Sequence, residues 1–136
     1  MTNREIVNAW FAAIDAKDFK TVKRLMDSDN HKFRNPMTPA PVGAEEHIGM
    51  MQLMTSAFEG KHTLSVIFGD DEHIAVSGKW TGKHTGEFNG ISATGKPVEF
   101  YFVDIFNIVN GKVKNEHFEM NPTAIMVQIG AVPPNA

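Results

Sequence analysis

The stretch from Val98 to Val109 places a carboxylate among aromatic side chains. Residues two apart on a β-strand point to the same face, which joins Asp104 to three aromatic neighbours: Phe100, Phe102 and Phe106. An acid in aromatic surroundings loses hydration, and the pKa of its carboxyl group tends to rise. Such a group can exchange protons with an apolar substrate. The sequence therefore predicts Asp104 as an acid or base, with the three phenylalanines around the substrate.

A structural role for Asp104 is the alternative. The opposite face of the same strand carries Tyr101, Val103 and Ile105, and it is also apolar enough to be buried. Alternation alone therefore leaves open which face meets a pocket. In the structural alternative, Asp104 accepts hydrogen bonds from neighbouring groups or faces a second copy of the chain.

The next expected strand carries two further acid–base candidates. His117 and Glu119 share one face with Asn121, whereas Phe118 and Met120 share the other. If the first face meets the pocket, His117 or Glu119 can carry a proton, and the unperturbed pKa of histidine lies near neutrality. A displacement by one residue would instead turn Phe118 and Met120 inward. Two groups do not make a metal site, which needs at least three convergent ligands, so no metal is predicted.

The other histidines are expected to have structural or surface positions. His84 lies between Gly82 and Gly86, where hydrogen bonding at a strand end is favoured over a role in the pocket. The remaining four share no face and no ligand spacing, and we expect them at the surface: His31, His47, His62 and His73.

Methionines and one tryptophan are candidates for a pocket wall. Flexible thioether side chains either fill a core or line an adaptable apolar pocket, and five methionines could do either: Met37, Met50, Met51, Met54 and Met120. Trp10 is expected on the inner face of the first helix, in the core or in the wall of the pocket.

The composition excludes several classes of function. The 136 residues suit a single domain over residues 1–136, and 42% hydrophobic and 21% charged residues are ordinary for a globular protein. The net charge is -3 and no basic run is present, so no nucleic-acid partner is expected. The absence of cysteine excludes disulfides and thiolate chemistry. No signal peptide and no bilayer-spanning run are recognised, so we expect a cytoplasmic protein without a membrane partner.

The elements that position these residues follow from the spacing of apolar residues. Thr2 and Glu5 form a capping-box pattern before a first helix, and Asp18 can cap a second. A short strand over residues 30–35, a proline-rich loop and a third helix over residues 44–58 follow, with Gly60 as the helix stop.

Beyond Gly60 the spacing changes to that of strands. They are expected at 62–68, 73–81, 98–109 and 112–120, with Asn110-Gly111 as a two-residue hairpin turn. Three helices followed by an antiparallel sheet is an α+β order. A sheet that curves around the helices would enclose a pocket between the two layers.

Four short motifs follow one another from Gly82 onward: Gly82-Lys83-His84-Thr85-Gly86-Glu87-Phe88-Asn89-Gly90, Ala93-Thr94-Gly95-Lys96-Pro97-Val98, Asn110-Gly111-Lys112-Val113 and Gln128-Ile129-Gly130. In order and spacing they resemble the SnoaL-like polyketide cyclases of the nuclear-transport-factor-2-like superfamily, over nearly the whole chain. The resemblance implies three N-terminal helices packed in the concave face of a curved antiparallel sheet, a cone-shaped α+β barrel. It also implies a buried pocket, a homodimer, and aldol ring closure on a hydrophobic small molecule without metal or cofactor.

The resemblance also implies positions for the site residues. The family's acid–base aspartate stands seven residues before the glutamine of the last motif, where this chain has Asn121, an amide that cannot abstract a proton at neutral pH. Asn35 matches a pocket asparagine of the family, Asp104 matches a polar pocket residue, and His117 replaces a frequent tryptophan.

Together these observations predict cofactor-free acid–base chemistry on a hydrophobic carbonyl compound, by aldol-type cyclisation or isomerisation. Asp104 would be one acid–base group and His117 or Glu119 a second, while Asn35 and Asn121 would donate hydrogen bonds to the developing oxyanion. Two alternatives stay open: a non-catalytic protein that binds an apolar ligand, and a dimerisation module with a filled pocket.

Overall fold

The first half of the chain forms three helices and one short strand in the computed structural model, which describes residues 1–133. Helix α1 spans Asn3–Asp15, α2 spans Phe19–Leu25, β1 spans Lys32–Arg34 and α3 spans Ala44–Ala57. The predicted capping box starts α1: the backbone N–H of Glu5 donates to Thr2 Oγ1 at 3.1 Å, and that of Thr2 donates to Glu5 Oε1 at 3.1 Å. Asp18 caps α2, as expected.

The second half forms a sheet and a last helix. Strands β2 (Phe58–Gly69), β3 (His73–His84), β4 (Pro97–Val109) and β5 (Lys112–Glu119) pair antiparallel, and β1 joins the edge of β5 in parallel. The sheet order is β1-β5-β4-β3-β2, and α4 (Pro122–Gln128) follows. Among the described residues, no helix is long and apolar enough to cross a membrane.

The predicted helix stop at Gly60 is wrong. Helix α3 ends at Ala57 and the chain continues directly into β2, so Gly60 lies inside a strand, opposite Gly82 of β3. A Cβ at either glycine would meet the Trp80 ring at 2.5 Å. The two glycines therefore make room for the Trp80 indole against the sheet, which is a packing role and not a helix-capping role.

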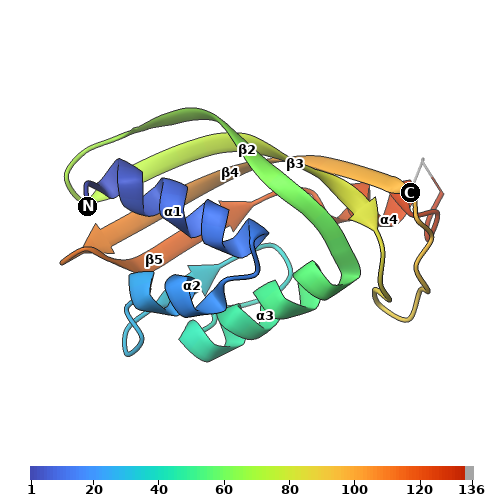
Figure 1. The fold of residues 1–136 in the computed structure, drawn as a ribbon, viewed down its shortest axis with the longest axis horizontal. Helices are drawn as coiled ribbons and strands as arrows, with labels where there is room; N and C mark the ends of the chain where they lie inside the picture. Colours follow the sequence, from blue (N-terminus) through green and yellow to red (C-terminus); the bar gives the residue numbers. More distant parts are fainter. Residues whose placement is uncertain (134–136) are drawn as a thin grey trace.

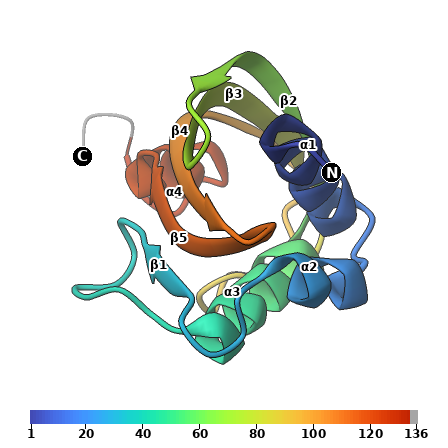
Figure 2. The same cartoon turned by 90° about the vertical axis from the view of Figure 1, so that its left-hand side faces the viewer.

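The helices fill the concave side of the sheet, as Figure 1 shows. Seen end-on, the strands follow an arc from β1 through β5, β4 and β3 to β2, and α1, α2 and α3 close the open side (Figure 2). The predicted fold class is thus confirmed: an α+β cone with three N-terminal helices in the concave face of a curved, mostly antiparallel sheet. The parallel pairing of β1 is the departure from a fully antiparallel sheet.

The β4–β5 hairpin determines which side chains enter the cone. Asn110 and Gly111 both have positive φ, 52° and 74°, as the predicted two-residue turn requires. Val109 therefore pairs with Lys112, but the register shifts by one residue between Ile108 and Asn107, where β5 bulges at Lys114. Beyond the bulge, Asp104 lies opposite Phe118. The shift places Phe118 on the inner face beside Asp104 and turns its neighbours along β5 outward.

Candidate active site

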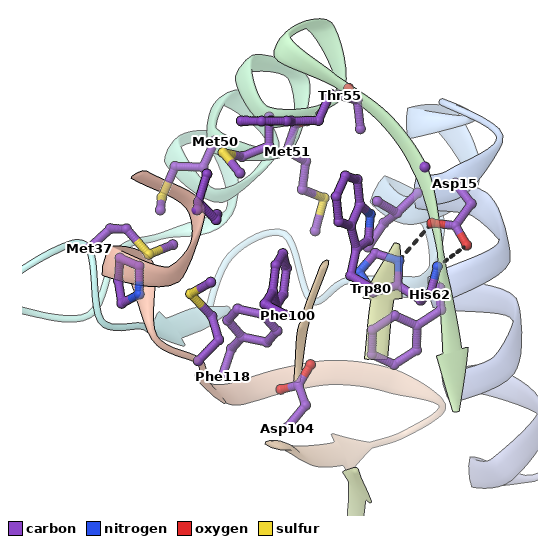
Figure 3. Close-up of a pocket in the computed structure, with 18 of the residues that line it drawn as sticks. Asp15, Met37, Met50, Met51, Thr55, His62, Trp80, Phe100, Asp104 and Phe118 are labelled. Atoms are coloured by element: carbon purple, nitrogen blue, oxygen red, sulfur yellow. Dashed lines mark hydrogen bonds and ion pairs between the residues drawn. The ribbon is translucent and has the colours of Figure 1, made fainter. Parts of the chain in front are cut away.

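A cavity of about 470 Å³ lies between α1, α3 and α4 and the concave face of the sheet. This volume falls within the roughly 300–1,000 Å³ range of small-molecule sites. Aromatic side chains form much of the wall: Trp10, Phe11, Phe33, Phe58, Trp80, Phe88, Phe100 and Phe118. Six of the chain's eight methionines complete it: Met37, Met50, Met51, Met54, Met120 and Met126 (Figure 3). The two roles considered for the methionines and Trp10 are combined: they line the cavity, and Trp10 and Met51 are also buried in the core.

Asp104 points from β4 into this cavity (Figure 3). Its side chain is fully buried, and neither carboxyl oxygen has a hydrogen-bond partner in good geometry among residues 1–133. Burial raises the pKa of Asp104 well above its usual value, and the neighbouring Glu116 carboxyl raises the pKa further. Burial therefore favours the neutral form of Asp104, which can donate a hydrogen bond or a proton.

Glu116 is the second buried carboxyl group of the cavity. Burial raises the pKa of Glu116 to about 7, while the interaction with Asp104 opposes that rise. Burial thus favours retention of a proton by the pair, and with a pKa of about 7 Glu116 exists in both protonation states near neutral pH.

Two successive hydrogen bonds lead from the backbone of β5 to His47, which faces Glu116. His31 Nδ1 lies 3.0 Å from the carbonyl oxygen of Val113, and His31 Nε2 lies 2.8 Å from His47 Nδ1. His47 Nε2 then faces Glu116 Oε1 at 3.8 Å. Because a carbonyl oxygen can only accept, His31 donates from Nδ1 and accepts at Nε2, and His47 donates from Nδ1.

The two hydrogen bonds of His31 and His47 leave the lone pair of His47 Nε2 facing Glu116. Burial lowers the pKa of His31, and burial lowers the pKa of His47 well below its usual value, so both rings are neutral at pH 7. A lone pair facing the carboxyl group favours the protonated form of Glu116.

The same three residues have the spacing of a possible metal site, since one donor atom from each of His31, His47 and Glu116 lies within 4.8 Å of the others. The facing nitrogens of the two histidines are already bonded to each other. The geometry is that of a hydrogen-bonded chain, and the absence of a metal stays a prediction.

Comparison with known proteins assigns the family. The sequence profile described as "SnoaL-like polyketide cyclase" matches residues 4–129. The chain belongs to the SnoaL-like polyketide cyclase family. The resemblance noted in the sequence is thereby confirmed, although none of the curated proteins matches the chain.

Solved structures share the SnoaL-like fold. AclR of Streptomyces galilaeus, described as a candidate hydroxylase, has a TM-score of 0.85 at 21% identity, over 96% of this chain and 82% of AclR. A SnoaL-like protein of Jannaschia sp. CCS1 has a TM-score of 0.84 at 21% identity, over 96% of this chain and 93% of its own. IdmH of Streptomyces antibioticus, described as a candidate polyketide cyclase, has a TM-score of 0.82 at 19% identity, over 93% of this chain and 97% of IdmH. Identities this low show a common fold.

Strand β5 of this SnoaL-like chain has the alternative orientation, in which a displacement by one residue turns Phe118 inward. His117 and Glu119 lie on the exposed outer face, where their side chains pair at 3.2 Å, and neither lines the cavity. Glu116 and Phe118 take the inward positions. The expectation that His117 and Glu119 could face the pocket is corrected, because the bulge at Lys114 exchanges the inner and outer faces of the rest of β5.

Two of the three predicted phenylalanines lie behind the cavity wall. Phe100 lines the cavity, whereas Phe102 and Phe106 are buried in the core beneath the ring of Phe11, at centroid distances of 5.6 and 5.7 Å. Their positions as substrate contacts are corrected, because the Phe11 ring of α1 packs against both phenylalanines, whereas Asp104 between them reaches the cavity.

Three other residues predicted to contact the substrate lie outside the cavity, where they form hydrogen bonds within loops or at a helix end. Asn35 is buried and accepts from the backbone N–H of Met37 at 2.8 Å. Asn121 is the exposed N-cap of α4, and accepts from the backbone N–H of Thr123 at 3.1 Å. His84 is buried with Nδ1 2.9 Å from Thr94 Oγ1, the structural role favoured from its flanking glycines.

The expectation of surface positions is wrong for three histidines. His31 and His47 are buried, and His47 and His62 line the cavity; only His73 of the four is exposed. One signal could have revealed His47, which lies four residues before Met51 and thus on the inner face of α3. His31 and His62 had no comparable local signal.

Proposed function

We propose that this SnoaL-like protein is a cofactor-free acid–base enzyme that acts on a hydrophobic carbonyl compound, by aldol-type cyclisation or isomerisation. One observation carries the proposal. Three residues that line a single apolar cavity have buried polar atoms without partners in the described chain: Trp10 Nε1, both oxygens of Asp104, and Glu116 Oε1. Leaving such groups unpaired costs about 1–3 kcal/mol each. A substrate carbonyl that bonds to them would offset that cost.

Asp104 and Trp10 would bind the carbonyl oxygen. As a proton leaves the neighbouring carbon, negative charge develops on this oxygen, and the neutral Asp104 acid and the Trp10 N–H can both donate to it. The enolate then either attacks a second carbonyl within the same molecule, which forms a carbon–carbon bond and closes a ring, or takes up a proton at another carbon. Glu116, available in both protonation states, can return a proton to Asp104.

A non-catalytic binding protein is the second candidate. The amide at position 121, where the family has its aspartate, favours it, and here that side chain caps a helix. The same cavity would then hold an apolar ligand without turning it over.

Deuterium exchange into a bound ketone should distinguish an enzyme from a binding protein. A substitution that fills the cavity should show whether the exchange takes place there. Thr55 lines the cavity from α3, whereas Gln52 is exposed on the same helix. With 2-tetralone as the probe, we expect the wild type to exchange the protons beside the carbonyl for deuterium in D₂O, with saturation. We expect Thr55→Trp to lower this rate by at least about tenfold through displacement of the bound ketone.

The matched control is Gln52→Trp, which adds the same side chain outside the cavity and should leave the rate unchanged. Exchange would be followed by proton NMR. Saturable binding of 2-tetralone without exchange above the buffer rate would support the binding protein over the enzyme.

We also propose that the protein is a homodimer. Exposed apolar side chains of β4 and β2 gather on the outer, convex face of the sheet: Val66, Phe68, Tyr101, Val103 and Ile105. Such clusters mark interaction surfaces more often than free surface. Ile105→Glu should convert a dimer into a monomer in light scattering coupled to size exclusion, while Gln52→Glu should not. A monomeric wild type would contradict the proposal.

A further inference from the structure

Asp15 and His62 form a second polar pair in the cavity wall, at the end of α1 and within β2. His62 Nδ1 lies 2.6 Å from Asp15 Oδ1, and the backbone N–H of His62 donates to Asp15 Oδ2 at 2.9 Å (Figure 3). One carboxylate thus holds both the ring and the backbone of a single histidine. These two contacts join residues that are 47 positions apart in the sequence.

Aromatic rings hold the imidazole on two further sides. The ring of Phe11 lies 4.9 Å from that of His62, and the ring of Phe102 meets it edge-on at 5.5 Å. The His62 side chain is only 12% exposed. Its orientation is therefore set by the protein before any ligand binds.

The Asp15 contact also determines which nitrogen is available. A carboxylate can only accept, so the ring proton of a neutral His62 lies on Nδ1 and the lone pair lies on Nε2. Within residues 1–133, the hydrogen bonds of His62 use its backbone N–H and Nδ1, and none uses Nε2. Asp15 and His62 thus present an oriented, unused proton acceptor in a wall of the same cavity that holds the neutral acid Asp104.

We propose that His62 is the general base of the reaction, with Nε2 as the proton acceptor, and that Asp15 is its positioning residue. The inference rests on the proposed acid–base function and identifies the base that removes the proton from carbon. Nε2 takes a proton from the carbon beside the substrate carbonyl, and the electrons of that carbon–hydrogen bond form the enolate. Asp104 stabilises the charge on the oxygen, and His62 later returns the proton to the product alkoxide or to another carbon.

Asp104 and Glu116, the two buried carboxyl groups of the cavity, fit this role less well. Burial and the neighbouring Glu116 carboxyl favour the protonated form of Asp104, and Glu116 faces the lone pair of His47, which favours its protonated form. A site with one group held as an acid and another oriented as a base is the usual arrangement for proton transfer at carbon.

A base-only reaction tests His62 separately from Asp104. The probe is 5-nitro-1,2-benzisoxazole: a base removes the ring C–H proton, the nitrogen–oxygen bond breaks, and a coloured 2-cyano-4-nitrophenolate forms. No carbonyl has to be polarised. We expect the wild type to catalyse this elimination with saturation, and His62→Ala to lower kcat/KM by at least about tenfold. Added imidazole should restore part of the lost rate, because the truncated side chain leaves room for it.

Matched variants distinguish a catalytic from a structural role. His73→Ala, which removes an exposed histidine of β3, should leave elimination unchanged. Asp15→Asn should lower kcat with little change in KM, and Asp15→Glu should recover part of kcat, since a carboxylate orients the ring. Thermal unfolding of His62→Gln, which keeps a polar side chain, would show whether loss of rate is loss of folding.

Several results would overturn the inference. These are a wild type without elimination above the buffer rate, full activity in His62→Ala, or a folded His62→Ala that imidazole does not rescue. Loss of elimination in Glu116→Gln with none in His62→Ala would assign the base to Glu116. Elimination that depends on His62, together with no exchange of 2-tetralone, would instead leave the base in place and reject the carbonyl chemistry proposed for Asp104.

Discussion

Asp104→Asn is expected to lower the rate of deuterium exchange into 2-tetralone by at least about a hundredfold. General-acid and oxyanion stabilisation are each worth about 10²–10³ or more in rate, and the amide cannot transfer a proton to the carbonyl oxygen. Apart from the interaction with the neighbouring Glu116 carboxyl, neither carboxyl oxygen has a hydrogen bond in good geometry among residues 1–133, so we expect the substitution to cost little stability. Activity should therefore fall without a matching fall in stability.

Exchange would be measured by proton NMR, and stability by thermal unfolding of the same samples. Asp29→Asn, a change of the same chemistry at an exposed site, is the control and should keep wild-type exchange. Asp104→Asn should also lower exchange far more than it lowers elimination of the benzisoxazole, which needs no polarised carbonyl. A variant that exchanges 2-tetralone at the wild-type rate would refute the role of Asp104.

Glu116→Gln is expected to change how stability depends on pH. In the folded state the pKa of Glu116 rises from its ordinary 4.5 to about 7, so folding favours the protonated form. The stability linked to this proton is complete below pH 4.5 and is lost as the pH rises through about 7. Over that range the wild type should lose about 3 kcal/mol of unfolding free energy that a glutamine variant keeps.

Urea unfolding of both proteins at pH 5 and pH 8 would measure this difference. The depressed pKa values of His31 and His47 act in the opposite direction, since their contribution is lost as the pH falls, but both proteins share it. The difference between the two proteins at each pH therefore reports Glu116 together with its effect on the neighbouring Asp104. An identical pH dependence in wild type and variant would show that Glu116 is not a buried acid with a raised pKa.

The overall fold was readable from local patterns because its main signals are local. The capping box at Thr2 and Glu5 starts α1, and Asn110-Gly111 makes the turn that joins β4 to β5. The burial of Asp104 was likewise readable from its aromatic neighbours on one face of a strand. Its function as an acid stays a prediction.

The inward face of β5 was not readable, because a single extra residue decides it. The bulge lies where Lys114 has no direct partner on β4, and this part of the strand contains no glycine or proline that would mark the irregularity. Without the bulge, Asp104 would pair with His117, and the histidine would lie inside the cone. The sequence left both orientations open.

The polar chain around Glu116 and the Asp15–His62 pair depend on contacts between distant segments. His31, in the loop before β1, meets His47 of α3 across 16 residues, and Asp15 meets His62 only because α1 lies against β2. Such pairs leave no periodic signal. The helical spacing of His47 and Met51 was the one local sign that a histidine faced inward.

The methionine-rich wall has a consequence for selectivity. Unbranched thioether side chains can adjust their torsion angles to rings of different outline, so shape alone would discriminate weakly between apolar compounds of similar size. Discrimination would then depend on the rigid polar groups, which accept a ligand only if its oxygen and its acidic carbon are correctly spaced. Among compounds that fit, turnover should therefore follow the position of the carbonyl group more closely than the outline of the ring system.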